Sequence, residues 1–125
     1  MMCFVGMPTI FYGDELGVQG IREEEYRAPM PWKGGDMALS GFFRKAIAMR
    51  HALSPLRDGT FQMLSAEEGS RVIRFRRDTG AASVTVAINV GETDAAVPPS
   101  EEKLYWAEGL QNGILSPGGF SGTYR

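Results

Sequence analysis

Two adjacent carboxylates, Asp14 and Glu15, are the residues of this 125-residue chain that most directly suggest chemistry. They follow residues 9–12, a run of β-branched and aromatic residues ending at Gly13, which predicts a short buried strand. Polar residues at the carboxyl end of a parallel strand are where α/β barrels place their active sites. Neighbouring residues of a strand point to opposite sides, so we do not expect Asp14 and Glu15 to flank one bond. We predict supporting roles for both.

The remaining chemistry-bearing residue types predict structural roles. The single cysteine, Cys3, excludes an intrachain disulfide, and its apolar neighbours predict a core position. The single histidine, His51, lies far along the chain on a predicted helix, so we expect no nucleophilic pair. One basic cluster is present, formed by Arg71, Arg74, Arg76 and Arg77. We interpret it as the solvated face of a strand rather than a polyanion site.

The bulk composition is that of an ordinary globular protein with one modest core. The chain is 43% hydrophobic and 22% charged, with a formal net charge of −2. This balance predicts neither a nucleic-acid nor a membrane partner. No apolar run approaches the ~20 residues of a membrane span, and no leader resembles a secretion signal. If the chain is part of a longer protein, the missing signal says nothing about where that protein works.

The predicted elements fall into two regions. Residues 13–36 lack periodicity and contain an acidic run, two prolines and a pair of glycines, which predicts a long loop packed onto a surface. Ser40 is the predicted N-cap of a helix to about Leu53, because apolar residues recur there at three- and four-residue spacing. From residue 59 onward the period changes to two, with the clearest strand over residues 83–89. Crowded short strands predict an antiparallel sheet or small sandwich.

Three segments together resemble the alpha-amylase superfamily of glycoside hydrolases. The first is similar to the family's eighth barrel strand and is formed by Gly6, Pro8, Ile10, Tyr12, Gly13, Asp14, Glu15, Leu16 and Gly17. The second resembles the loop after that strand and is formed by Arg27, Pro29, Met30, Pro31 and Trp32. The third, residues 42–59, is similar to the eighth helix and its exit. The loop is similar to those of neopullulanases, cyclomaltodextrinases and alpha-glucosidases, although the segment Glu23 to Tyr26 departs from the sequence usually found before the arginine.

The resemblance implies an α+β fragment. Residues 1–57 would be the last strand, loop and helix of a (β/α)8 barrel, and residues 58–125 an antiparallel, sandwich-like C-terminal domain. Family enzymes cleave α-glucosidic bonds with retention, using two carboxylates about 5 Å apart and a second Asp. Because these residues follow the fourth, fifth and seventh barrel strands, their equivalents would precede residue 1. The resemblance therefore implies no catalytic residue in this chain.

Four residues are candidates for sugar contacts or for supporting the site: Asp14, Glu15, Arg27 and Trp32. Arg27 either pairs with Asp14 or Glu15 or reaches a sugar hydroxyl. Trp32 either stacks on a glucose ring or packs against the barrel edge. Tyr105 and Trp106 could form a further platform, but we expect one of them to face the core because strand residues alternate.

The expected partner is the N-terminal barrel of a longer enzyme. The exposed edges of residues 9–12 also predict irregular packing of residues 1–35 or a homodimer formed through them. No metal or cofactor is expected in this chain, while calcium binding stays open for the longer protein. Two rival functions are an independent carbohydrate-binding module, with weak α-glucan binding, and a structural or interaction domain.

Overall fold

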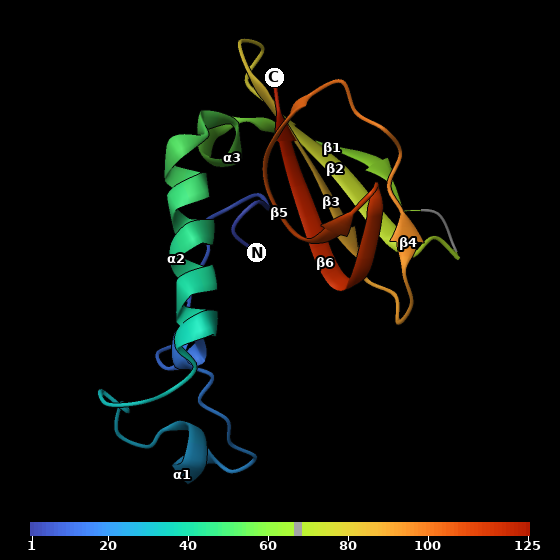
Figure 1. The fold of residues 1–125 in the computed structure, drawn as a ribbon. Helices are drawn as coiled ribbons and strands as arrows, with labels where there is room; N and C mark the ends of the chain where they lie inside the picture. The colour runs from blue at the N-terminus through green and yellow to red at the C-terminus, as the bar shows by residue number, and fades with distance from the viewer. Residues whose placement is uncertain (67–68) are drawn as a thin grey trace. The chain divides into compact units, whose positions relative to one another are not determined.

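The computed structural model describes residues 1–66 and 69–125, apart from the side chain of Tyr26. Its contacts divide the chain into two compact units, Met1–Ala52 and Leu53–Arg125, which we treat separately (Figure 1). The division falls at residue 52, because the helical turn over residues 54–58 packs with the strands that follow it. Among the described residues, no helix is both long and apolar enough to cross a membrane.

The first unit is built around one long helix, α2 (Met37–Ala52). Asp36 caps it, since its Oδ1 accepts a hydrogen bond from the Leu39 backbone N–H at 2.9 Å. That N–H is one of the first-turn donors that have no partner inside the helix. The predicted N-cap, Ser40, instead lies inside the helix and is buried. The prediction was wrong because Asp36 meets the helix one turn earlier.

The segment predicted to be a strand, residues 9–12, has no strand structure. It is followed by a single 3₁₀ turn, η1 (Asp14–Leu16), bounded by Gly13 and Gly17 with φ of 90° and 70°. A strand exists only where another strand hydrogen-bonds to it, and the described part of this unit offers none. The expectation that Asp14 and Glu15 diverge along an extended strand therefore fails as well.

The predicted irregular loop contains one further helical turn, α1 (Glu23–Tyr26). The Glu25 carboxylate caps it by accepting hydrogen bonds from the backbone N–H groups of Ile21 at 2.8 Å and Arg22 at 3.2 Å. These two bonds lower the pKa of Glu25. The acidic run is thus partly used to begin a helical turn, where negative charge meets the positive end of the helix dipole.

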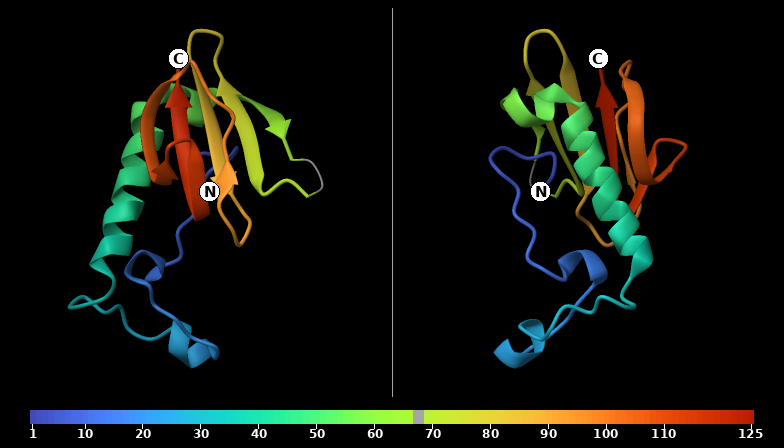
Figure 2. Two further views of the ribbon diagram at one scale, coloured as in Figure 1. Left: turned by 45° about the vertical axis from the view of Figure 1, so that its right-hand side comes forward. Right: turned by 90° about the vertical axis from the view of Figure 1, so that its left-hand side faces the viewer.

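The N-terminal residues are attached to α2 by Arg50. Its guanidinium donates to the backbone oxygens of Met2 at 2.7 Å, Phe4 at 3.1 Å and Gly6 at 2.7 Å. Three carbonyls of an irregular segment thereby gain a donor that no strand provides. Figure 2 shows this segment returning along the helix.

The second unit is an antiparallel sheet preceded by the short helix α3 (Ser54–Asp58). Its strands are β1 (Thr60–Ser65), β2 (Val72–Asp78), β3 (Ser83–Asn89), β4 (Ala95–Ala96), β5 (Lys103–Gln111) and β6 (Ile114–Tyr124). The order is β1-β2-β3-β6-β4, with β5 paired to β6. The predicted antiparallel domain is confirmed in this form, as one curved six-stranded sheet (Figures 1 and 2).

The sheet is covered on both faces in its centre. In β3, five consecutive residues, 83–87, are buried, so the alternation in the sequence is not matched by alternating exposure. On one face, Val72 and Ala87 form a buried cluster with Leu115 of β6. Ala95, Val97 and Leu110 pack against this cluster. The long strand β6 makes this cover, because its residues 120–124 pair with β3 while residues 114–115 pair with β4.

The basic cluster is not a solvated face, and that interpretation is corrected. Arg77 is only 2% exposed, and its guanidinium donates to the backbone oxygens of Leu56 at 3.1 Å, Gly59 at 2.8 Å and Thr60 at 3.2 Å. It therefore joins α3 and the start of β1 to β2. Three of the four arginines, Arg74, Arg76 and Arg77, lie on β2 as predicted, while the exposed Arg71 precedes it; β2 is an interior strand, which explains why Arg77 is buried.

Candidate functional site

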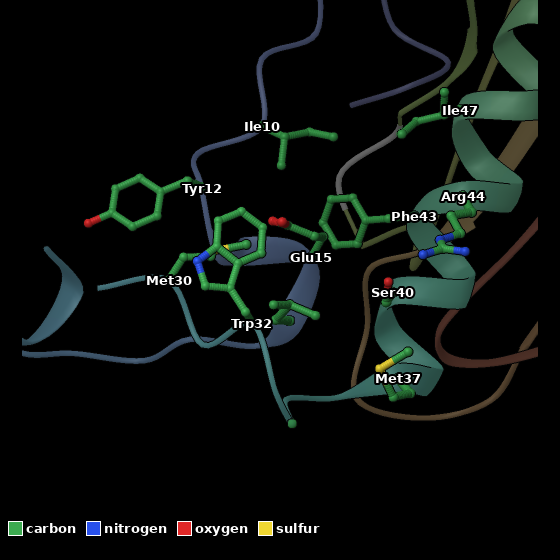
Figure 3. A pocket seen from close by; sticks show the side chains of 12 residues that line it. Ile10, Tyr12, Glu15, Met30, Trp32, Met37, Ser40, Phe43, Arg44 and Ile47 are labelled. Carbon is green, nitrogen blue, oxygen red and sulfur yellow. The ribbon is translucent and has the colours of Figure 1, made fainter. Parts of the chain in front are cut away.

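A pocket of about 640 Å³ lies in the first unit, between η1, the segment around Trp32 and the first turns of α2 (Figure 3). Its lining is mostly aromatic and aliphatic, with one carboxylate and one guanidinium. The residues that matter below are Tyr12, Glu15, Trp32, Phe43 and Arg44. A concave, largely apolar surface with a few polar groups is the usual form of a ligand site.

Glu15 belongs to this pocket, and Asp14 does not. The 3₁₀ turn directs them differently: Glu15 is half-buried, and its Oε2 accepts a hydrogen bond from the Gly13 backbone N–H at 3.0 Å. Asp14 is exposed. The turn thus places Glu15 in the lining of the pocket and leaves Asp14 out of it.

Trp32 is the most accessible aromatic residue of the pocket, with 86% of its surface exposed. Its backbone N–H bonds the oxygen of Met30 at 2.9 Å, which holds a tight turn in the loop. Figure 3 shows the indole beside Met30, across the pocket from the α2 residues Phe43 and Arg44. An indole held in this way offers a flat apolar face to solvent.

Arg27 lies outside the pocket. It forms an ion pair with Glu23 at 2.7 Å, one helical turn away, and both side chains are more than half exposed. It pairs with neither Asp14 nor Glu15. Exposed pairs of this kind contribute little stability, so this contact orders α1 only weakly.

The described lining of this pocket holds fewer acidic groups than glycoside cleavage needs. That reaction needs an acid and a nucleophile or base on opposite sides of the bond, and the described lining holds one carboxylate, Glu15. Within residues 1–66 and 69–125, no group of three or more His, Cys, Asp or Glu side chains could hold a metal ion. The chemistry of this pocket is therefore that of packing and recognition.

Tyr105 and Trp106 lie on the same face of the sheet, contrary to the expected alternation. A bulge in β5 leaves Tyr105 without a partner between the pairs Leu104–Thr123 and Trp106–Gly122. The Tyr105 ring packs on Tyr124 at 5.9 Å, and the Trp106 ring packs on Phe120 at 4.6 Å. A bulge inserts one residue and so re-aims the next side chain, which sequence periodicity cannot reveal.

A polar network centred on Glu102 was not predicted. Its carboxylate pairs with Arg76 at 2.9 Å and accepts hydrogen bonds from Thr85 at 3.1 Å and Thr123 at 2.6 Å. Burial raises the pKa of Glu102, but the bonds from Thr123 and Thr85 and the charge of Arg76 outweigh it, so the pKa lies below its usual value. The network ties the start of β5 to β2, β3 and β6. No local pattern announces it, because its members are far apart in the sequence.

Comparison with known proteins gives a consistent set of relatives. The chain is 36% identical over 88 residues to a cyclomaltodextrinase from Bacillus sp, covering 69% of this chain and 16% of that protein. It is 32% identical over 90 residues to neopullulanase 2 from Thermoactinomyces vulgaris, covering 70% of this chain and 15% of that protein. No protein-family model matches.

A solved structure carries the likeness over nearly the whole chain. The maltogenic amylase from S. marinus superposes with a TM-score of 0.82 at 26% identity. This match covers 98% of the present chain and 18% of the amylase chain. The chain thus spans only a small part of the proteins it resembles.

Proposed function

Because the chain is homologous to the C-terminal part of alpha-amylase-family enzymes, we propose that it serves as that part of an α-glucan-hydrolysing enzyme and hydrolyses nothing by itself. The observation that carries this proposal is the coverage: one match spans 69% of the chain but 16% of the relative. The single carboxylate of the described pocket lining supports the second half of the proposal.

We propose that residues 1–52 are the last strand and helix of a (β/α)8 barrel, with the rest of that barrel as their partner. Support comes from apolar side chains that this unit leaves exposed, including Met7 at 91% and Ile21 at 96%. In a barrel, residues 9–12 would gain neighbouring strands on both edges, which they lack here. Without a barrel, the same surface would favour a homodimer.

The substrates of the whole enzyme are proposed from the names of the relatives. Cyclomaltodextrinase and neopullulanase indicate cyclic maltodextrins and pullulan. The bond cleaved would be α-glucosidic, with retention. Calcium binding, if present, would belong to the longer protein.

A chimera tests the proposal. The segment of the Bacillus sp cyclomaltodextrinase that matches this chain is replaced by residues 1–125, and hydrolysis of a cyclic maltodextrin is measured beside the separate chain. We expect activity in the chimera and none in the separate chain. Hydrolysis by the separate chain, or a soluble and folded chimera without activity, would contradict the proposal.

Light scattering of the separate chain measures whether it forms a homodimer when the rest of the barrel is missing. We expect a dimer at high concentration, with residues 1–12 protected from hydrogen exchange only in the dimer. A monomer that protects the same residues would show that the unit needs no partner.

The second candidate function is a carbohydrate-binding module. It is favoured by the exposed faces of Trp32, at 86%, and Tyr105, at 41%. Calorimetric titration with maltooligosaccharides separates the two functions. Heat that disappears in both Trp32→Ala and Tyr105→Ala favours the module, whereas heat that both variants retain, or no heat at all, favours the accessory part.

A further inference from the structure

A second pocket, of about 450 Å³, lies in the β unit. Its lining includes Val72 of the buried cluster and Ala95, which packs against that cluster. Residues from the end of β1, the start of β2 and the β4 region line it. Its polar lining consists of Ser65, Ser70, Arg71, Arg74 and Asp94. The volume falls within the range of small-molecule sites.

Arg74 is the unusual member of this lining. It is half-buried, and its Nε is shielded from solvent without a hydrogen-bond partner. In the part of the chain that the structure describes, no carboxylate forms an ion pair with it. A buried donor without an acceptor costs free energy, so such groups in folded proteins usually face a ligand or water.

The neighbouring groups limit what this ligand could be. Arg71 donates one hydrogen bond to Thr93 and still lines the pocket. Asp94 lines the pocket too, is exposed, and forms no ion pair with any described residue. An anion would be attracted by both arginines but repelled by the Asp94 carboxylate. A cation would be attracted by Asp94 but repelled by both arginines.

A neutral ligand with several hydroxyl groups satisfies both kinds of side chain. Each hydroxyl accepts from a guanidinium and donates to a carboxylate. We propose that this pocket binds a neutral polyhydroxylated ligand, a glucose unit of an α-glucan, with Arg74 and Arg71 as donors and Asp94 as acceptor. The choice of α-glucan rests on the proposed function. All of its described lining residues belong to the β unit.

Titration of the whole 125-residue chain with maltotriose, followed by NMR, tests the proposal. We expect the Nε–H signal of Arg74 and the amides of residues 70–72 and 94–96 to shift at millimolar ligand. Asp94→Asn should weaken binding about tenfold, because it removes a charged acceptor. The matched control, Glu92→Gln, changes an exposed acid that does not line the pocket and should bind as before.

Four outcomes would overturn the inference. In the first, inorganic phosphate produces the shifts instead of maltotriose, and Asp94→Asn tightens its binding; that result would identify an anion site. Maltotriose could shift only residues elsewhere. Binding could also persist in the folded double variant Arg71→Gln/Arg74→Gln. Glu67 and Glu68 lie outside the described residues, and loss of binding in Glu67→Gln/Glu68→Gln would likewise overturn the role of Asp94.

Failure here is separate from failure of the proposed function. The chimera reports hydrolysis by the complete enzyme, whereas this titration reports binding by the separate chain. An active chimera with no maltotriose contact at Arg74 would refute only the pocket. Contact at Arg74 with an inactive, folded chimera would refute only the accessory role.

Discussion

In each unit an arginine donates hydrogen bonds to backbone carbonyls, but the two arginines are buried to different extents. Arg50 donates to three backbone carbonyls of the irregular N-terminal segment, and Arg77 donates to three backbone carbonyls at the junction of α3 and β1. Arg77 is 2% exposed and belongs to the interior strand β2, whereas Arg50 is only half-buried. The difference shows which unit holds its own core. Most of the buried hydrophobic residues belong to the β unit, whereas Met2 and Met49 are the buried ones among the described residues 1–52, and many apolar side chains there are exposed.

Replacing the two arginines tests this comparison with the largest expected effect. Arg77→Leu removes the guanidinium donor from the oxygens of Leu56, Gly59 and Thr60, the first of them in a buried hydrogen bond, and should destabilise the β unit by about 3–5 kcal/mol. Arg50→Leu should cost about 1 kcal/mol, since water can replace its bonds. Urea unfolding followed by circular dichroism measures both. Equal losses would refute the contrast in burial.

Substitution of Leu115 tests the core of the β unit. It is completely buried among Val72 and Ala87, so Leu115→Ala should cost about 2–5 kcal/mol through lost burial and a cavity. The adjacent Ile114 is 44% exposed, and Ile114→Ala should cost under about 1 kcal/mol. Urea midpoints of the two variants compare neighbours on one strand. A similar loss in both would mean that β6 does not bend over the sheet as described.

Glu102 should make the stability of the β unit depend on pH. Its pKa in the folded protein is lowered, so its contribution is complete above the ordinary value of 4.5 and is lost as the pH falls through the lower folded value. Glu102→Gln should lose about 1.5–3 kcal/mol at pH 7. The variant should also show a flatter stability profile in acid. Thermal melts between pH 3 and 7 measure this profile; an unchanged slope in the variant would contradict the role of the carboxylate.

The smallest effect lies at the start of α2. Asp36→Ala should destabilise the helix by about 1 kcal/mol, because the Leu39 N–H loses its acceptor. Ser40→Ala, at the position that sequence alone favours as the cap, should have less effect. Amide exchange at Leu39 measures both. Faster exchange in Ser40→Ala than in Asp36→Ala would restore the sequence-based assignment.

Much of the fold was predictable where the pattern is local. The alternation at residues 83–89 predicted β3, and the three- and four-residue spacing after Ser40 predicted most of α2. Both patterns arise from neighbours within a turn or two of the chain. Prediction failed for residues 9–12, where apolar β-branched residues suggested a strand that has no partner.

The candidate sites were less predictable than the fold. The sequence placed Glu15 and Trp32 among the candidate contacts, and they share one pocket, whereas Asp14 and Arg27 lie outside it. The second pocket brings together Arg74 and Asp94, which lie 20 positions apart in the sequence, so spacing could not suggest it. Tyr105 was misjudged because a bulge changes the side-chain direction without leaving a local pattern.

The sequence by itself determined the family resemblance, the antiparallel character of the β unit and the position of the long helix. These follow from residue types and their periods, which short-range sterics and solvent exposure impose. Only the tertiary structure decided that Arg77 is buried, that Glu102 joins four strands, and that Tyr105 and Trp106 share a face. Each of these features depends on which strand, distant in the sequence, pairs with the strand in question. A hydrogen-bond partner far along the chain does not affect the local sequence pattern.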